Sequence, residues 1–212
     1  MKKPPAHTGK LSHRALLIGA STLLNDEKLR TNDSLFVESG ALTVLTGSNL
    51  HHRMRFVAGL VRAHPGDSLH QIYWFSRYWT VHEVIKTLIK AQLSQSYLRT
   101  AVTRDAIAQA IEQTELLNLH FETSQRSITE VVGHIEQQVK MHTPRLIVVD
   151  GLEHYRASPS EYRPPEAIPD SLALLKDLAA NFEIPVLITC LPPPADWSNA
   201  AVEAADQVIA LS

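Results

Sequence analysis

The chain has 212 residues, 44% of them hydrophobic, which is enough to build one ordinary hydrophobic core. Its formal net charge of -2 excludes the strong overall basicity of a dedicated nucleic-acid binder, so any contact with DNA must be local. No stretch reaches the roughly 18 apolar residues of a membrane-spanning helix. The single cysteine, Cys190, lies in an apolar run, where we expect a buried, unreactive thiol. These features predict a protein of the cytoplasm, or of the nucleus in a eukaryote.

The chain begins with a basic segment. Residues 1–34 contain only a short, interrupted apolar part, and their positive charges include Lys2, Lys3, Lys10 and Arg14. We therefore predict a basic N-terminal tail and lead-in segment over 1–34, followed by a single domain over 35–212. The charges of the tail are candidates for contacts with phosphate groups.

Beyond the tail, short apolar runs alternate with segments whose apolar residues recur every three or four positions. The runs predict strands at 34–39 or 41–47, then at 70–76, 117–124, 145–151, 184–190 and 206–212. The periodic segments predict helices at 52–64, 80–98, 104–117, 127–142 and 170–182. Ser127 and Glu130 have the spacing of a capping box at the start of the fourth helix. Because several strands are apolar on both faces, we predict an α/β fold with a mostly parallel sheet and helices on both faces.

The segment ALTVLTGSNLHHRM, residues 41–54, has the strand, loop and helix layout of a phosphate-binding P-loop but lacks most of its chemistry. A working loop reads G-x-x-x-x-G-K-[ST]. Counting from Gly47, His52 stands at the second glycine, Arg53 at the lysine and Met54 at the hydroxyl residue. The Cβ of His52 disfavours a positive φ, Met54 offers magnesium no oxygen ligand, and the planar guanidinium of Arg53 does not replace an ammonium group. We expect that ordinary Mg-ATP binding is lost, although one glycine after a strand also occurs by chance.

From about residue 35 onward, the order and spacing of these segments resemble the RecA-like core of DnaB-type replicative helicases and recombinase paralogues. YWFSRYW, residues 73–79, resembles the strand that carries the glutamate that activates water, and Tyr78 takes the glutamate position. A phenol is no general base at neutral pH. RLIVVDGLEHY resembles the Walker B strand with Asp150 on its aspartate, and EIPVLITCLPPP resembles a later strand with Leu191 at the sensor position. The resemblance implies a three-layer RecA-like fold with a degenerate nucleotide site.

VVDGLEHY and LALLKDLAANF also resemble small recombinase paralogues that pair with a SWIM-domain protein. The family likeness therefore implies a non-catalytic accessory protein in DNA recombination or replication. Its expected partner is a RecA-like ATPase, a helicase or another paralogue, with single-stranded or duplex DNA as a second candidate. One alternative is a divergent NTPase in which Arg53 and Asp150 still hold a nucleotide weakly. Another is a regulator or loader-type binder of a replicative helicase that does not contact DNA.

The candidates for binding DNA or a protein partner are Arg53, Arg55, Tyr155, Arg156, Tyr162 and Arg163. The first two belong to the degenerate loop, beside His51 and His52. The others follow the fourth predicted strand, in the proline-rich stretch 153–170, where the family places a DNA-facing loop. Arginines suit phosphates, and the two tyrosines suit stacking on bases. The plainer interpretation is a solvated loop, and for Asp150 a residue that caps the end of its strand.

The eleven histidines do not show the paired spacing of a metal site. His51 and His52 are adjacent, so their rings point in different directions on a regular element. We expect surface or loop histidines, no metal site and no cofactor. No G-x-S-x-G motif of a serine hydrolase is present.

Trp74 is expected in the core, while Tyr78 and Trp79 are expected to fill the vacated nucleotide site or to form a partner surface.

Overall fold

The computed structural model describes residues 37–63, 71–96, 103–123, 126–155, 168–191 and 204–211. A six-stranded sheet lies at its centre. Its strands are β1 (Leu42–Gly47), β2 (Ile72–Ser76), β3 (Leu119–Thr123), β4 (Leu146–Asp150), β5 (Val186–Cys190) and β6 (Gln207–Leu211). Their order across the sheet is β3-β2-β4-β5-β1-β6, and every neighbouring pair is parallel. The predicted mostly parallel sheet is thus confirmed, and all of its pairings among the described residues are parallel.

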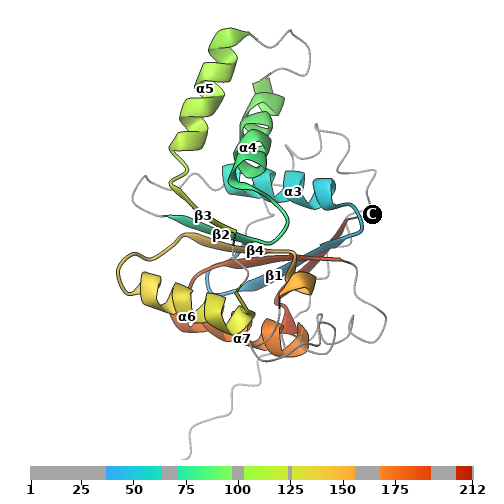
Figure 1. Ribbon diagram of the computed structural model, residues 1–212, viewed down its shortest axis with the longest axis vertical. Helices are drawn as coiled ribbons and strands as arrows, with labels where there is room; N and C mark the ends of the chain where they lie inside the picture. Colours follow the sequence, from blue (N-terminus) through green and yellow to red (C-terminus); the bar gives the residue numbers. More distant parts are fainter. Residues whose placement is uncertain are drawn as a thin grey trace, which may run out of the picture.

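Helices cover both faces of this sheet, which confirms the three-layer α/β architecture. They are α3 (Leu50–Ala63), α4 (Val81–Ser96), α5 (Arg104–Glu115), α6 (Ile128–Val139) and α7 (Ile168–Phe182), with a short 3-10 turn η1 (Leu152–His154). In Figure 1, α3 and α4 lie over one face, with α5 beside α4 and farthest from the sheet. The helices α6 and α7 lie side by side under the other face. No helix within the described ranges is long and apolar enough to cross a membrane.

The sheet separates two hydrophobic cores because successive side chains of a strand point to opposite faces. On β4, Ile147 and Val149 join the core under α6 and α7, whereas Leu146 and Val148 join the core under α3 and α4. Every residue of β1, β2, β4 and β5 is buried. Burial on both faces explains why these strands are continuous apolar runs rather than alternating patterns.

Several local predictions can be compared directly with the structure. The capping box is confirmed: the Ser127 hydroxyl accepts from the Glu130 backbone N–H at 3.3 Å, and the Glu130 carboxylate accepts from the Ser127 N–H at 2.7 Å. Cys190 is buried as expected, and burial raises the pKa of its thiol to about 12. Of the two alternatives for the first strand, 41–47 is right, and residues 37–39 are not extended in the sheet.

Two helices begin earlier than predicted. α3 begins at Leu50 rather than at residue 52, and α7 begins at Ile168 rather than at residue 170. The predicted lead-in segment 1–34 lies outside the described residues, so its separation from the domain 35–212 stays a prediction.

Candidate functional site

The carboxyl ends of the parallel strands meet at one edge of the sheet, which is where open α/β sheets bind their ligands. Ser76 ends β2, Asp150 ends β4, and Thr189 lies near the end of β5, the neighbour of β4. Strand alternation places Ser76 and Asp150 on the same face as Trp74 and Val148, which is the face covered by α3. Three strands far apart in sequence therefore bring their polar side chains together beneath the start of α3.

Asp150 forms the centre of a buried hydrogen-bond cluster. Its side chain is 1% exposed, Ser76 Oγ donates to one carboxylate oxygen at 2.9 Å, and the Thr189 hydroxyl donates to the other. Burial raises the pKa of the Asp150 carboxyl, while the two hydroxyl donors and a nearby guanidinium act in the opposite direction. Both oxygens thus already accept hydrogen bonds from the protein, as expected for a carboxylate that caps the end of its strand.

Ser76 extends this cluster to the next turn of the chain. Its hydroxyl oxygen accepts from the backbone N–H groups of Tyr78 and Trp79 at 3.2 and 3.1 Å. On the other side, the Gly151 N–H donates to the Thr189 hydroxyl at 3.1 Å. The cluster therefore fixes the turns that follow β2 and β4.

The connection between β1 and α3 is too short for a P-loop. β1 ends at Gly47 and α3 begins at Leu50, so only Ser48 and Asn49 lie between them. Asn49 Oδ1 accepts from the backbone N–H of His52 at 3.1 Å, which satisfies one of the free donors at the start of the helix. In a P-loop protein the helix begins near the second glycine, with the lysine and the hydroxyl residue in its first turn, so four residues follow the first glycine before the helix. Here Leu50 and His51 are already helical, so the helix begins two residues before the predicted start at residue 52 and leaves a shorter loop than a P-loop has.

Gly47 serves close packing at this connection. A Cβ at this position would lie 3.0 Å from the Leu211 Cβ and 3.2 Å from the Leu211 carbonyl oxygen on the neighbouring strand β6. Contacts this short are tighter than ordinary packing, so a larger residue would push Leu211 away by a few tenths of an ångström, and glycine avoids this. Gly47, which matches the first glycine of the P-loop pattern, therefore has a packing role that does not involve phosphate.

Arg53 points into the protein. Its side chain is 1% exposed, and Nη1 and Nη2 donate to Glu153 Oε1 at 3.4 and 3.5 Å. The Tyr78 hydroxyl donates to the same oxygen at 3.4 Å. Among the described residues, Arg53 Nε and Glu153 Oε2 are buried without a hydrogen-bond partner. The expectation that Arg53 contacts DNA or a partner is wrong, because its charge is buried and paired with a carboxylate.

Tyr78 covers the turn that follows β4. Its ring stands edge-on to the His154 ring, with centroids 4.2 Å apart. Gly151 has a φ of +77°, and a Cβ there would lie 2.6 Å from Tyr78 Cε2, so both its conformation and its neighbour require glycine. Burial lowers the pKa of His154, as do the positive charges of Arg77 and Arg53. Tyr78 stays 36% exposed, so the ring closes the site at the surface.

The remaining candidates are dispersed. Met54 and Trp79 are buried in the core beneath α3, and the Trp79 ring also contacts His51 with centroids 5.2 Å apart. Trp74 is buried in the same core, as expected. His52 is partly buried, whereas Arg55 and Leu191 are exposed. Trp79 therefore packs inside the domain and does not form a partner surface.

Tyr155 lies in the core beneath α6 and α7. The Arg77 guanidinium lies 5.5 Å from its ring centroid, and burial raises the pKa of its phenol. The expectation that Tyr155 stacks on bases is wrong, because the ring has no face open to solvent. Arg156, Tyr162 and Arg163 lie outside the described residues.

Sequence reasoning assigned no role to four residues that hold the site together: Asn49, Ser76, Thr189 and Glu153. Asn49 stands directly before an apolar-periodic segment, which is an N-cap signal that could have been used. Glu153 offered no such signal, because its partner Arg53 lies 100 positions away in sequence. Only the pairing of the strands brings these two side chains together.

Comparisons with known proteins now bear on the fold. No protein-family model and no curated protein sequence matches the chain. A solved structure of a DnaB-like replicative helicase and its interactions with primase is similar, with a TM-score of 0.59 and 15% identity over 73% of this chain. This match covers 39% of the helicase chain. The ATPase domain of G40P is similar with a TM-score of 0.64 and 14% identity, over 81% of this chain and 69% of that domain. At this level of identity the likeness shows the fold alone, so the chain has a RecA-like α/β fold.

Proposed function

We propose that this protein is a non-catalytic RecA-fold accessory protein in DNA recombination or replication, which binds a RecA-like ATPase, a helicase or another paralogue. The observation that carries the proposal is the two-residue connection between β1 and α3. A cradle for phosphates needs several consecutive backbone N–H groups that point into one loop. Here the helix begins at Leu50, and Asn49 accepts from the backbone N–H groups of His52 and Arg53 at 3.1 Å each, so these two donors are already used within the chain.

The charged groups of the site support the same proposal. Arg53 is paired with Glu153, so an incoming phosphate would have to compete with a carboxylate for the guanidinium. Asp150 is enclosed by two hydroxyl donors and is buried, so a magnesium ion would have to displace these bonds. Tyr78 supplies no base for the attack of water. Each of these groups already has a structural partner within the chain.

The partner-binding half of the proposal is supported by exposed apolar side chains. Ile107 and Ile111 lie one turn apart on α5, and both are more than two-fifths exposed. On α4, Val81 and Ile85 are also exposed at the same spacing. Exposed apolar side chains that recur along a helix are typical of contact with another protein. RecA-like domains generally associate side by side, so an inactive copy can take the place of a neighbour and modulate assembly.

The proposal is tested first with Mg-ATP. We expect the purified chain to show no ATP turnover above a blank and no upward shift of its melting temperature. A nucleotide present at 100 times its Kd would stabilise the fold by about 2.7 kcal/mol, which a thermal melt detects readily. An active DnaB-like helicase measured under the same conditions is the positive control. A clear shift or magnesium-dependent turnover would instead favour a divergent NTPase.

DNA is the second candidate partner and is tested separately. We propose that Arg156 and Arg163 contact phosphates, so replacing both with alanine weakens binding and lowers the salt dependence by about one unit of slope per lost contact. Lys86 and Lys90, two exposed cations of α4, give a control variant with the same loss of charge. Single-stranded and duplex DNA are titrated at several salt concentrations. Equal binding by all variants would place the DNA contact away from Arg156 and Arg163, whereas no binding by the wild type would favour a regulator that does not contact DNA.

A further inference from the structure

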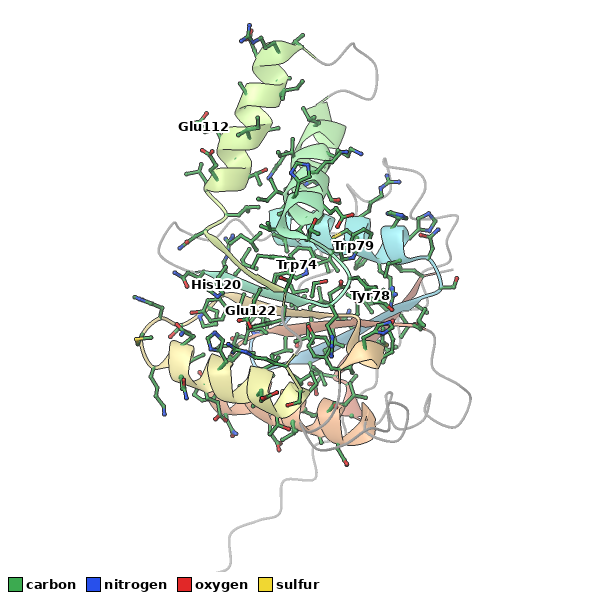
Figure 2. The ribbon with its side chains drawn as sticks, in the orientation of Figure 1. Trp74, Tyr78, Trp79, Glu112, His120 and Glu122 are labelled. Carbon is green, nitrogen blue, oxygen red and sulfur yellow. The ribbon has the colours of Figure 1, made fainter. Side chains whose placement is uncertain are left out.

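Two imidazoles and a carboxylate converge at the β3 edge of the sheet, away from the site of Asp150. His120 and Glu122 are two residues apart on β3 and therefore point to the same face. Figure 2 labels both on this edge strand. His134 projects from α6, which covers that face. One ligand atom of each residue lies within 4.8 Å of the ligand atoms of the other two.

The three side chains approach one another closely. His134 Nε2 lies 3.6 Å from Glu122 Oε2, and the rings of His120 and His134 have centroids 6.5 Å apart. Within the described part of the chain, His134 Nε2 is buried and has no hydrogen-bond partner. A buried nitrogen of this kind loses its hydration without gaining a full hydrogen bond. A metal ion would supply the missing partner.

Neighbouring side chains hold the three residues in place. The second oxygen of Glu122, Oε1, lies 3.3 Å from Arg126 Nε, so Oε2 stays directed at His134. Tyr73 contacts the His120 ring edge-on with centroids 5.2 Å apart, and Phe75 contacts the His134 ring in the same way at 6.3 Å. Residues that orient the ligands are a regular part of metal sites in proteins.

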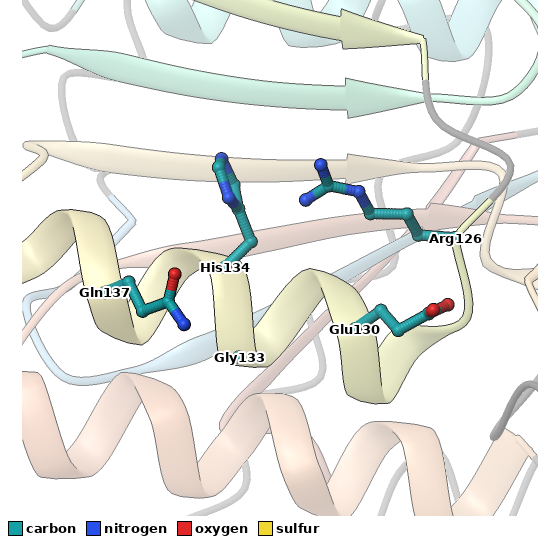
Figure 3. A pocket seen from close by; sticks show the side chains of 5 residues that line it. All are labelled: Arg126, Glu130, Gly133, His134 and Gln137. Atoms are coloured by element: carbon teal, nitrogen blue, oxygen red, sulfur yellow. The ribbon is translucent and has the colours of Figure 1, made fainter.

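The cluster borders an open pocket, through which an ion and water can enter. The pocket has a volume of about 390 Å³ and is lined by Arg126, Glu130, Gly133, His134 and Gln137. Figure 3 shows His134 and Arg126 extending from the backbone toward the strands. His134 is therefore shared between the cluster and this opening.

We propose that His120, Glu122 and His134 bind a zinc ion, with Glu122 coordinating through Oε2 and water at the fourth position. Two imidazole nitrogens and one carboxylate oxygen form a known zinc ligand set, and three protein ligands leave one position open. Bond lengths of about 2.0–2.1 Å place tetrahedral ligand atoms about 3.3 Å apart, so the cluster contracts slightly when zinc enters. His120 is exposed and supplies most of this movement. The bound ion links the edge strand β3 to α6.

The proposal is independent of the proposed function and is tested by zinc titration. Full-length, tag-free protein is treated with a chelator, and ZnCl2 is added in a calorimeter in competition with a chelator of known affinity. We expect one tight equivalent in the wild type, and a loss of affinity of at least about tenfold in Glu122→Gln and His134→Gln. His82→Gln and His142→Gln are matched controls, because both histidines are exposed and outside the cluster. Cobalt titration should give the visible bands of a tetrahedral ion in the wild type and controls only.

Further variants keep the test decisive if a buried substitution disturbs folding. His120→Gln changes an exposed side chain, and circular dichroism checks the fold of each variant. Hydrogen exchange of the β3 amides should slow with zinc in the wild type and stay unchanged in Glu122→Gln. The proposal is overturned if the wild type binds no zinc, or if the Glu122 and His120 variants bind it as the wild type does.

Discussion

The buried hydroxyl of Ser76 takes part in three hydrogen bonds. It donates to Asp150 and accepts from two backbone N–H groups in the turn before α4. Ser76→Ala removes a donor from a buried carboxylate and leaves both N–H groups without their acceptor. We therefore expect the free energy of unfolding to fall by about 2–3 kcal/mol. Urea denaturation measures this change, with Ser48→Ala as the control, since Ser48 is exposed just beyond the end of β1. An equal, small effect of both substitutions would contradict the role of Ser76.

Asp150 gives the stability of the fold a dependence on pH. Burial raises the pKa of this carboxyl in the folded state, so the folded protein holds the proton more tightly than the unfolded chain. Below about pH 4, the ordinary value for aspartate, both states are protonated and the contribution is complete. As pH rises from there, the unfolded chain loses its proton first, and stability falls until the folded-state pKa is passed.

Asp150→Asn removes this titration. The stability of the variant relative to the wild type should therefore rise with pH across that window, by at most about 1.4 kcal/mol per pH unit, and then become constant. Urea denaturation of both proteins in a series of buffers from acid to neutral pH measures the difference. A difference that falls with rising pH would mean that the folded state favours the charged carboxylate.

At the level of elements, the start of α3 decides what the site can bind. The triple variant His52→Gly, Arg53→Lys and Met54→Thr introduces the residue types of a P-loop into a segment that is already helical. It also opens the core, because Met54 is buried, and breaks the pair between Arg53 and Glu153. We expect no magnesium-dependent ATP turnover and a lower melting temperature. A coupled-enzyme assay and a thermal melt measure both, and turnover above that of the wild type would show that the segment can still form the loop.

At the scale of the whole molecule, α5 is the most peripheral element of the described fold, and it packs against α4 (Figure 1). Ile107 and Ile111 of α5 are both more than two-fifths exposed, so we expect that charging them spares folding and weakens the binding of a partner. The double variant Ile107→Glu and Ile111→Glu is compared with Gln109→Glu and Gln113→Glu. The control adds the same charge at the same spacing on exposed positions of α5.

The native partner is first identified by co-purification from the host and then titrated as a purified protein. We expect at least about a tenfold loss of affinity for the isoleucine variant alone, as for the removal of apolar interface anchors. Equal binding by both variants would move the interface away from α5.

Much of the fold could be predicted because its signals are local. Apolar runs between periodic segments located the strands of the sheet, and the spacing of Ser127 and Glu130 located the start of α6. The burial of Cys190 followed from the apolar run around it. Errors at the starts of α3 and α7 were two residues each, because caps depend on single side chains such as Asn49 rather than on periodicity.

The candidate site was harder to predict because its residues meet through strand order. Arginine side chains are usually exposed. Arg53 is nevertheless buried, because the turn after β4 places Glu153, 100 positions away in sequence, beside its guanidinium. Tyr155 lies near the start of the proline-rich stretch 153–170, yet its side chain packs into the core. The cluster of His120, Glu122 and His134 joins a strand to a helix, so no spacing in the sequence marks it.

The sequence by itself determined the alternation of strands and helices, the burial of the central strands and the absence of the P-loop residue types at positions 52–54. These properties depend on side-chain chemistry and on neighbours a few positions away. Only the tertiary structure decided that Arg53 is paired, that Asp150 is enclosed by hydroxyl groups and that two histidines meet a glutamate at the sheet edge. Those contacts join residues from separate strands and helices, and the order in which parallel strands pair in the sheet determines which of them become neighbours.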